Sequence, residues 1–168
     1  MAPDLNELPE NARVVLMCGV SGSGKTVLSR RIEQMGFVRL SADELIWERY
    51  GDTFPDMPAD ERRAIFGRTA TEIENMIDRA LTRGERVVVD STLCRRAKRD
   101  AIRQVCRRHD VTPLFLHLDP DADTLRHRLG MRTGSGPNDQ IVPECDLESF
   151  IRNFEHAGPD ETDCITLK

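Results

Sequence analysis

The chain has 168 residues, of which 39% are hydrophobic and 32% are charged. This length suits a single domain over residues 1–168, because domains usually hold roughly 100–200 residues. No run approaches the ~18 apolar residues of a membrane-spanning helix, and the acidic stretch over residues 1–11 lacks the apolar core of a secretory signal. We therefore expect a globular protein without a membrane partner.

Charge and cysteine content exclude two further classes of protein. With 24 basic and 29 acidic side chains, the net charge is −5, so the chain as a whole is not a basic nucleic-acid binder. The five cysteines are odd in number and include no CxxC pair, which indicates neither a disulfide framework nor a zinc site. Reduced thiols are typical of the cytoplasm, and we expect the protein there.

Hydrophobic periodicity predicts alternating strands and helices along the chain. Residues 14–18 form a continuous apolar run, as in a strand that is buried on both faces. The pattern then predicts, in chain order, a helix over 26–35, a strand over 37–40, a turn into a helix at 41–44, a loop over 50–58, a helix over 58–83, a strand over 87–89, a helix over 97–109, a strand over 113–118, a helix from 121 to about 131, a loop over 133–138, a helix from 143 to about 156 and a strand over 164–167.

This alternation indicates βαβ units and therefore an α/β fold. We expect three layers, α/β/α, around a mostly parallel five-stranded sheet. In such sheets ligands bind at the carboxyl ends of the strands, and the polar motifs of this chain fall at those ends.

The segment from Gly19 to Thr26 reads GVSGSGKT and matches the phosphate-loop pattern GxxxxGK[ST] in full. Glycines allow successive backbone N–H groups to face a polyphosphate, and the positive end of the following helix points to the same place. Lys25 of the motif reaches the β- and γ-phosphates, and the Thr26 hydroxyl binds Mg²⁺. We therefore expect a P-loop NTPase fold that takes ATP and Mg²⁺, with a cradle made of Gly19, Val20, Ser21, Gly22, Ser23, Gly24, Lys25 and Thr26.

Two acids follow predicted strands at the same edge of the sheet. Asp43 comes just after the second strand, where a kinase needs a carboxylate to accept the proton of an attacking hydroxyl. A helix N-cap fits this position equally well, with either Ser41 or Asp43 as the cap, and Glu44 is the rival if the register shifts by one. Asp90 ends the third strand, as a second Mg²⁺-organising carboxylate would, and Thr92 is placed to hold substrate. Helix capping is again the alternative.

Two arginines precede a flexible Gly-Ser-Gly loop. Arg128 and Arg132 are four residues apart, so the predicted helix places them on one face. On a hinged lid at about 126–142 they would neutralise the charge that builds during phosphoryl transfer, and lid closure would exclude water. A solvated helix face is the alternative, and we expect it for Arg126.

A second group of basic residues repeats at every fourth position near the helix over 97–109. The stripe consists of Arg95, Arg99, Arg103 and Arg107. It could follow a nucleic-acid backbone, although a solvated outer helix face is the commoner explanation. No interleaved aromatic residues offer base stacking.

Together these segments resemble the small P-loop kinases of the polynucleotide 5′-kinase, chloramphenicol phosphotransferase and zeta-toxin group, which includes AAA-type ATP-binding proteins. The resemblance runs from about Val14 to Glu161 and rests on GVSGSGKT, SADEL, VVVDST and LRHRLGMR. It implies that Asp43 is the general base and that Arg128 and Arg132 are the lid arginines. It also implies that the lid and a late loop hold adenine.

The acceptor side departs from this family. Polynucleotide kinases usually carry arginine just before the base and again three residues after it, but these positions are Ala42 and Ile46 here, and Leu93 replaces a common asparagine. A small or partly apolar acceptor is therefore favoured. Four residues are near enough in sequence to line its pocket, although core packing explains them equally well: Trp47, Tyr50, Phe54 and Met57.

We predict a P-loop kinase that moves the γ-phosphate of Mg-ATP to a hydroxyl group of a small molecule. The predicted catalytic residues are Lys25, Asp43, Arg128 and Arg132, with Thr26 and Asp90 at the metal. A polynucleotide 5′-hydroxyl kinase and a nucleotide-dependent switch without kinase activity are the alternatives.

Overall fold

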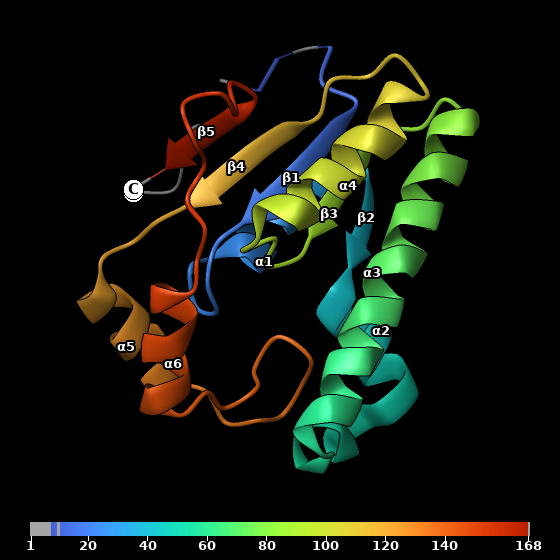
Figure 1. Cartoon of the computed structure of the whole chain (residues 1–168). Coiled ribbons are helices and arrows are strands. Elements are labelled where there is room, and N and C mark those ends of the chain that lie inside the picture. The colour runs from blue at the N-terminus through green and yellow to red at the C-terminus, as the bar shows by residue number, and fades with distance from the viewer. Residues whose placement is uncertain (1–7, 10, 168) are drawn as a thin grey trace.

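The fold is taken from a computed structural model that describes residues 8, 9 and 11–167. The expectation about residues 1–11 therefore lies largely outside the described residues. Five strands form one sheet in the order β2-β3-β1-β4-β5, and all neighbouring pairs are parallel (Figure 1). They are β1 (Val14–Cys18), β2 (Val38–Ser41), β3 (Val87–Asp90), β4 (Leu114–Leu118) and β5 (Cys164–Leu167). This confirms the predicted α/β fold class.

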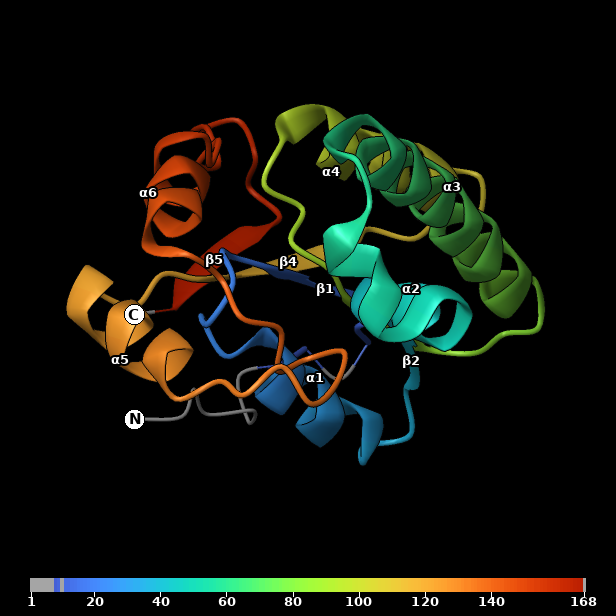
Figure 2. The same ribbon diagram turned by 90° about the horizontal axis from the view of Figure 1, so that it is seen from below.

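The helices lie on both sides of the sheet, with α1 on one face and α3 and α4 on the other (Figure 2). In chain order they are α1 (Lys25–Glu33), α2 (Ala42–Tyr50), the short 3-10 helix η2 (Gly51–Asp56), α3 (Ala59–Thr82), α4 (Arg96–Arg107), α5 (Ala122–Gly130) and α6 (Glu144–Arg152). None of the helices in the described part of the chain combines the length and the hydrophobicity needed to traverse a bilayer.

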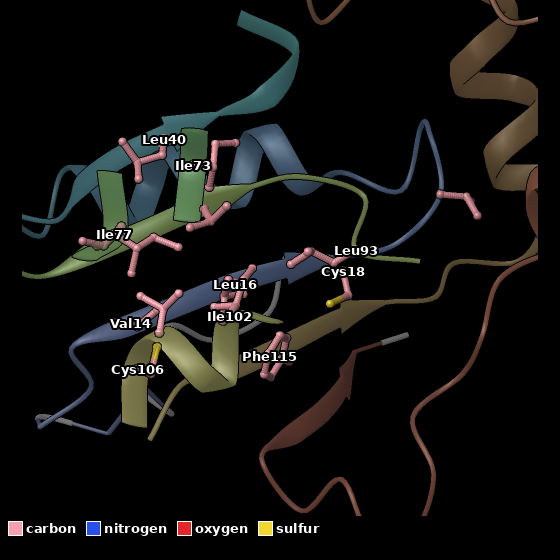
Figure 3. Packing of buried hydrophobic residues seen from close by; sticks show 14 of the residues in the cluster. Val14, Leu16, Cys18, Leu40, Ile73, Ile77, Leu93, Ile102, Cys106 and Phe115 are labelled. Carbon is pink, nitrogen blue, oxygen red and sulfur yellow. The ribbon is translucent and has the colours of Figure 1, made fainter. Parts of the chain in front are cut away.

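Strand β1 lies at the centre of the sheet because both of its faces are apolar. All five of its residues are buried, and alternate side chains point to opposite layers. Val15 packs with Leu28 of α1, whereas Leu16 packs with Ile102 of α4 (Figure 3). The phosphate loop that follows β1 is therefore anchored between two hydrophobic layers.

Helix α6 is shorter than predicted and ends at Arg152 rather than near residue 156. The chain leaves the helix because Phe154 is drawn into the core, where its ring stacks on His117 with the centroids 4.6 Å apart. The backbone N–H of Glu155 then donates to the carbonyl of Cys94 at 2.8 Å. The segment after α6 consequently runs back beside the start of α4.

Two arginines of the expected basic stripe are buried, which contradicts both a solvated face and a nucleic-acid contact for them. The side chains of Arg99 and Arg103 are 2% and 10% exposed. Arg99 donates through two nitrogens to both carboxylate oxygens of Glu161, each at 2.8 Å. Arg103 donates to Glu161 at 2.8 Å and to Asp163 at 2.7 and 2.8 Å. The carboxylates of Glu161 and Asp163, in the C-terminal segment, lie on this face of α4. Arg99 and Arg103 therefore pair with them instead of facing solvent.

The other two members of the stripe, Arg95 and Arg107, are exposed. The stripe is therefore divided between a buried ion cluster and open surface. The cluster joins α4 to the segment just before β5. Removing one partner of a buried ion pair leaves an uncompensated buried charge, so breaking this connection should be costly.

We predict that Glu161→Gln destabilises the protein by about 3–5 kcal/mol at neutral pH, because the buried guanidinium group of Arg99 loses its carboxylate partner, whereas Arg103 keeps Asp163. Hydrogen bonds from Arg99, and further ones from Arg103, outweigh burial and lower the pKa of Glu161 to about 2. The stability that its charge contributes is complete above the ordinary value of 4.5 and is lost as the pH falls towards about 2.

Urea unfolding of the wild type and the variant between pH 7 and pH 2 measures both effects. The exposed α6 residue Glu148 offers a matched control, Glu148→Gln, which should unfold like the wild type. Equal stability of Glu161→Gln and the wild type at pH 7 would contradict this account of the cluster.

Candidate active site

The phosphate loop has a backbone that favours glycine at three points, Gly19, Gly22 and Gly24. Gly19 has φ +146°, and a Cβ atom there would lie 2.6 Å from Ser23 Oγ and 2.7 Å from the carbonyl oxygen of Leu118. Gly24 caps the N-terminus of α1 in the left-handed conformation with φ +102°, which other residues adopt at a cost. The loop thus brings backbone N–H groups and the helix N-terminus together, as a polyphosphate requires.

Lys25 lies buried at the start of α1 with its Nζ donating to the carbonyl oxygen of Val20 at 2.9 Å. Burial lowers the pKa of Lys25, while the nearby charges of Asp90 and Asp43 act in the opposite direction. Among the described residues no carboxylate forms an ion pair with it. A buried ammonium group that has only a neutral carbonyl as its partner is suited to an anionic ligand.

The first lid arginine contacts the phosphate loop directly. Nη1 of Arg128 donates to the carbonyl oxygens of Gly22 and Ser23, both at 3.2 Å. These carbonyls belong to the loop itself, so the guanidinium group lies beside the cradle, and the residue is exposed to solvent there. Its predicted neighbour Arg126 is exposed and pairs with Glu144 at 2.7 Å, as expected for a surface residue.

The second lid arginine does not share a helix face with the first, because α5 ends at Gly130. Arg132 lies beyond this end, yet its Nη1 donates to Ser21 Oγ at 3.1 Å and to the carbonyl of Gln140 at 3.0 Å. Burial lowers the pKa of Arg132, and the charges of Asp139 and Asp43 oppose that shift. The predicted proximity of both arginines to the phosphate loop is present, but the shared helix face is not.

A third arginine, which the sequence analysis did not single out, lies under the site. Arg39 of β2 has a side chain that is only 6% exposed. Its Nε donates to Ser29 Oγ at 2.9 Å, Nη2 to Asp90 at 3.0 Å, and Nη1 and Nη2 to both oxygens of Glu44 at 2.8 and 2.9 Å. Burial alone would lower the pKa of Arg39, but the hydrogen bonds to the two carboxylates raise it. An arginine in a short strand followed by Asp43-Glu44 was the available signal.

Arg39 divides the neighbouring carboxylates into two kinds. Hydrogen bonds from Arg39, with further ones from Asn138 and Arg30, lower the pKa of Glu44. Asp43 has no side-chain hydrogen bond to any residue that the structure describes. Its surroundings crowd it enough that burial raises its pKa, with the charge of Asp90 adding to this and that of Lys25 opposing it. Asp43 nevertheless remains exposed to solvent.

Capping is contradicted for both acids, whereas Ser41, the other candidate cap of α2, is confirmed. The N-cap of α2 is Ser41, whose Oγ accepts from the backbone N–H of Glu44 at 3.4 Å. The N-cap of α4 is Arg95, five residues after Asp90. Asp90 is 5% exposed and accepts from Ser29 Oγ of α1 at 3.2 Å. It therefore lies directly behind the first turns of the phosphate-loop helix.

Thr92 contributes through its backbone. Its carbonyl accepts from the N–H of Gly19 at 3.2 Å, which ties the end of β3 to the phosphate loop. Its side chain is exposed. Leu93 follows with φ +45°, a left-handed conformation that asparagine tolerates better than leucine. Burial of Leu93, at 8% exposure, and a hydrogen bond from Arg99 to its carbonyl hold it there.

Three of the four residues expected near an acceptor pack in a small core of their own. Phe54, with Tyr50 and Met57 beside it, joins Ile46 and Ile65 between α2 and α3. For these residues the packing explanation holds. Trp47 is half-buried outside this cluster, one helical turn after Asp43.

A pocket of about 200 Å³ opens beside Val20 at the end of β4. Its walls include His117, Phe154 and His156, and burial lowers the pKa of His117. None of the carboxylates described above lines it. No group of three or more His, Cys, Asp or Glu side chains within residues 8, 9 and 11–167 is arranged to hold a metal ion.

The family model described as an AAA domain (AAA_33) matches residues 14–157. The chain therefore belongs to this family, and the resemblance to the small P-loop kinases is confirmed. No curated protein matches the chain.

Solved structures show the same fold. A sugar kinase from Janibacter sp. is 26% identical, with a TM-score of 0.70 over 93% of this chain and 84% of that one. A gluconokinase from Sinorhizobium meliloti is 22% identical, with a TM-score of 0.66 over 91% and 80%. A chain of the Pnkp1/Rnl/Hen1 RNA repair complex is 17% identical, with a TM-score of 0.69 over 90% of this chain and 47% of that one. The architecture is thus that of a P-loop kinase.

We predict that Arg39→Lys lowers the free energy of unfolding by about 1–3 kcal/mol, because a lysine cannot replace the two-pronged contact with Glu44 while also bonding Asp90. Urea unfolding measures the change. Arg31 on α1 is half-buried and provides the matched control Arg31→Lys. If Arg39→Lys and Arg31→Lys unfold alike, the buried arginine does not hold the two acids.

Proposed function

We propose that this protein is an ATP-dependent kinase that transfers the γ-phosphate of Mg-ATP to a hydroxyl group of a small molecule. One observation carries the proposal: among the residues that the structure describes, no side chain hydrogen-bonds the carboxylate of Asp43, which lies at the same sheet edge as the buried ammonium group of Lys25. A base must have a free oxygen to accept a proton, and a phosphate-binding lysine must be free of other anions. Both conditions hold here.

In this reaction the acceptor oxygen attacks the γ-phosphorus, its proton passes to Asp43, and the bond to the leaving ADP breaks. Lys25 would bind the β- and γ-phosphates, and Arg128 and Arg132 would offset the charge that grows on them. Glu44 is not suited to be the base because both of its oxygens are taken by Arg39.

Thr26 and Asp90 are the residues that would hold Mg²⁺. Both offer oxygen ligands, which this cation prefers. They lie near one another because Ser29 Oγ donates either to the carbonyl of Thr26, at 3.1 Å, or to Asp90, at 3.2 Å. When bound, Mg²⁺ supplies charge neutralisation at the transferred phosphate.

Two observations support a small acceptor. The sugar kinase from Janibacter sp. is similar over most of both chains, whereas the likeness to the RNA repair protein concerns the fold alone. In addition, the arginine stripe that favoured a nucleic acid has its central members, Arg99 and Arg103, committed to buried carboxylates. The cysteines form no disulfide, which suits the cytoplasm, and we propose that the protein works there.

We predict that Asp43→Asn lowers acceptor-dependent ADP release by roughly 10²–10⁴-fold, the usual contribution of a general base, and leaves ATP binding intact. Lys25→Ala should lose productive ATP use altogether. A coupled assay with a panel of sugars and polyols measures the rates. The exposed Asp52 of η2 offers the control Asp52→Asn, which should behave like the wild type.

An unchanged rate in Asp43→Asn would remove the base from the proposal. If ADP release were slow, independent of every acceptor and equal in both variants, a nucleotide switch would replace the kinase.

We also predict the pH dependence of transfer. A base acts only when ionised, so the rate falls as the pH drops through the pKa of Asp43. Because that pKa is raised by burial, the acid limb of the pH–rate profile should lie above the range of an ordinary aspartate, near 3.9. An acid limb at or below that range would show that burial does not raise the pKa of Asp43, or that Asp43 is not the base.

A further inference from the structure

The loop after α5 reaches into the proposed metal side of the site through one residue, Asn138. Its side-chain Nδ2 donates to Glu44 Oε1 at 3.0 Å. Its Oδ1 accepts from the hydroxyl of Thr26 at 3.3 Å. Asn138 is 112 residues from Thr26 in sequence, and it spans the distance between the phosphate-loop helix and α2.

Asp139 gives this loop its shape. Its Oδ2 accepts from the N–H and the hydroxyl of Thr133 and from the N–H and the hydroxyl of Ser135, at 2.6–3.2 Å. The backbone N–H of Gly134 also donates to the carbonyl of Asp139 at 2.9 Å. With its neighbour held this firmly, Asn138 is presented at a fixed place on the lid.

The partner of Asn138 on α2 is equally fixed. Glu44 is gripped on both oxygens by the buried Arg39. A carboxylate that is ionised can only accept hydrogen bonds, and the pKa of Glu44 is lowered by Arg39. The amide nitrogen of Asn138 must therefore face Glu44, and its oxygen must face the other way.

This orientation of the amide decides which partner donates in the hydrogen bond between Asn138 and Thr26. The amide oxygen of Asn138 is an acceptor, so the Thr26 hydroxyl has to donate its hydrogen to it. The lone pairs of Thr26 Oγ1 are then left free, which is the state a threonine needs to bind a cation. Among the described residues no hydrogen bond joins Asp90 to the Thr26 hydroxyl, and the Oδ2 atom of Asp90 accepts from Ser29 and Arg39 instead.

We propose that Asn138 is a positioning residue for Mg²⁺: the lid, through Asn138 and Glu44, orients the Thr26 hydroxyl for the metal. Closure of the lid and completion of the metal site are then one event. This inference rests on the proposed function, since it assigns Mg²⁺–nucleotide to the site.

The test is ADP binding by titration calorimetry, with and without Mg²⁺, in the wild type and in Asn138→Ala. Residues that orient a metal ligand typically contribute 10–100-fold to metal affinity. Without Mg²⁺, we expect the variant and the wild type to bind ADP with the same Kd. The factor by which Mg²⁺ lowers this Kd should be at least roughly tenfold smaller in the variant. Glu44→Ala removes the other end of the hydrogen-bond series from Glu44 through Asn138 to Thr26. It should reduce the effect of Mg²⁺ on the Kd for ADP by a similar factor. The exposed Asn75 of α3 gives the matched control Asn75→Ala.

The outcomes separate the two proposals. If the wild type binds no ADP under either condition, the proposed function fails. If Mg²⁺ tightens ADP binding equally in the wild type and in Asn138→Ala, the site binds nucleotide but the role of Asn138 is wrong. Tighter Mg²⁺-dependent binding in the variant would also overturn it, because Asn138 would then compete with the metal. If Asn138→Ala lost as much ADP affinity without Mg²⁺ as with it, the role of Asn138 would be purely structural and the proposal would be wrong.

Discussion

The chemistry of this sheet edge depends on how one buried guanidinium group shares its hydrogen bonds. Three carboxylates, Asp43, Glu44 and Asp90, meet near the end of β2 and β3, and their charges would repel one another. Arg39 binds two of them and leaves the third free. Because the free one is Asp43, the division by itself separates a candidate base from acids that hold structure.

Buried arginine–carboxylate bonds recur elsewhere in the molecule and connect distant parts of the chain. Arg99 and Arg103 fasten the segment before β5 to α4 through Glu161 and Asp163. That connection helps to hold β5 at the edge of the sheet beside β4. A chain with few lysines thus uses arginine where several acceptors must be bonded at once, which the planar guanidinium group does better than an ammonium group.

Much of this fold and part of the site could be predicted from sequence, because both depend on local patterns. Apolar runs located the five strands, and the phosphate-loop motif placed Lys25 and Thr26. Asn138 could not be found in this way, since its partners Glu44 and Thr26 lie 94 and 112 residues away along the chain. The bond from Arg39 to Asp90 likewise spans 51 residues. The arginine stripe was misinterpreted for a related reason: periodicity shows that residues share a helix face, but not what covers that face.

The most direct test of the proposed activity is ³¹P NMR of the products formed from Mg-ATP in the presence of the protein. The acceptors are a panel of small polyhydroxy compounds and, separately, an oligonucleotide with a free 5′-hydroxyl. This account predicts ADP together with a new phosphomonoester signal on at least one small compound, and none on the oligonucleotide. Inorganic phosphate as the sole product with every acceptor, or an ester only at the oligonucleotide 5′ end, would contradict it.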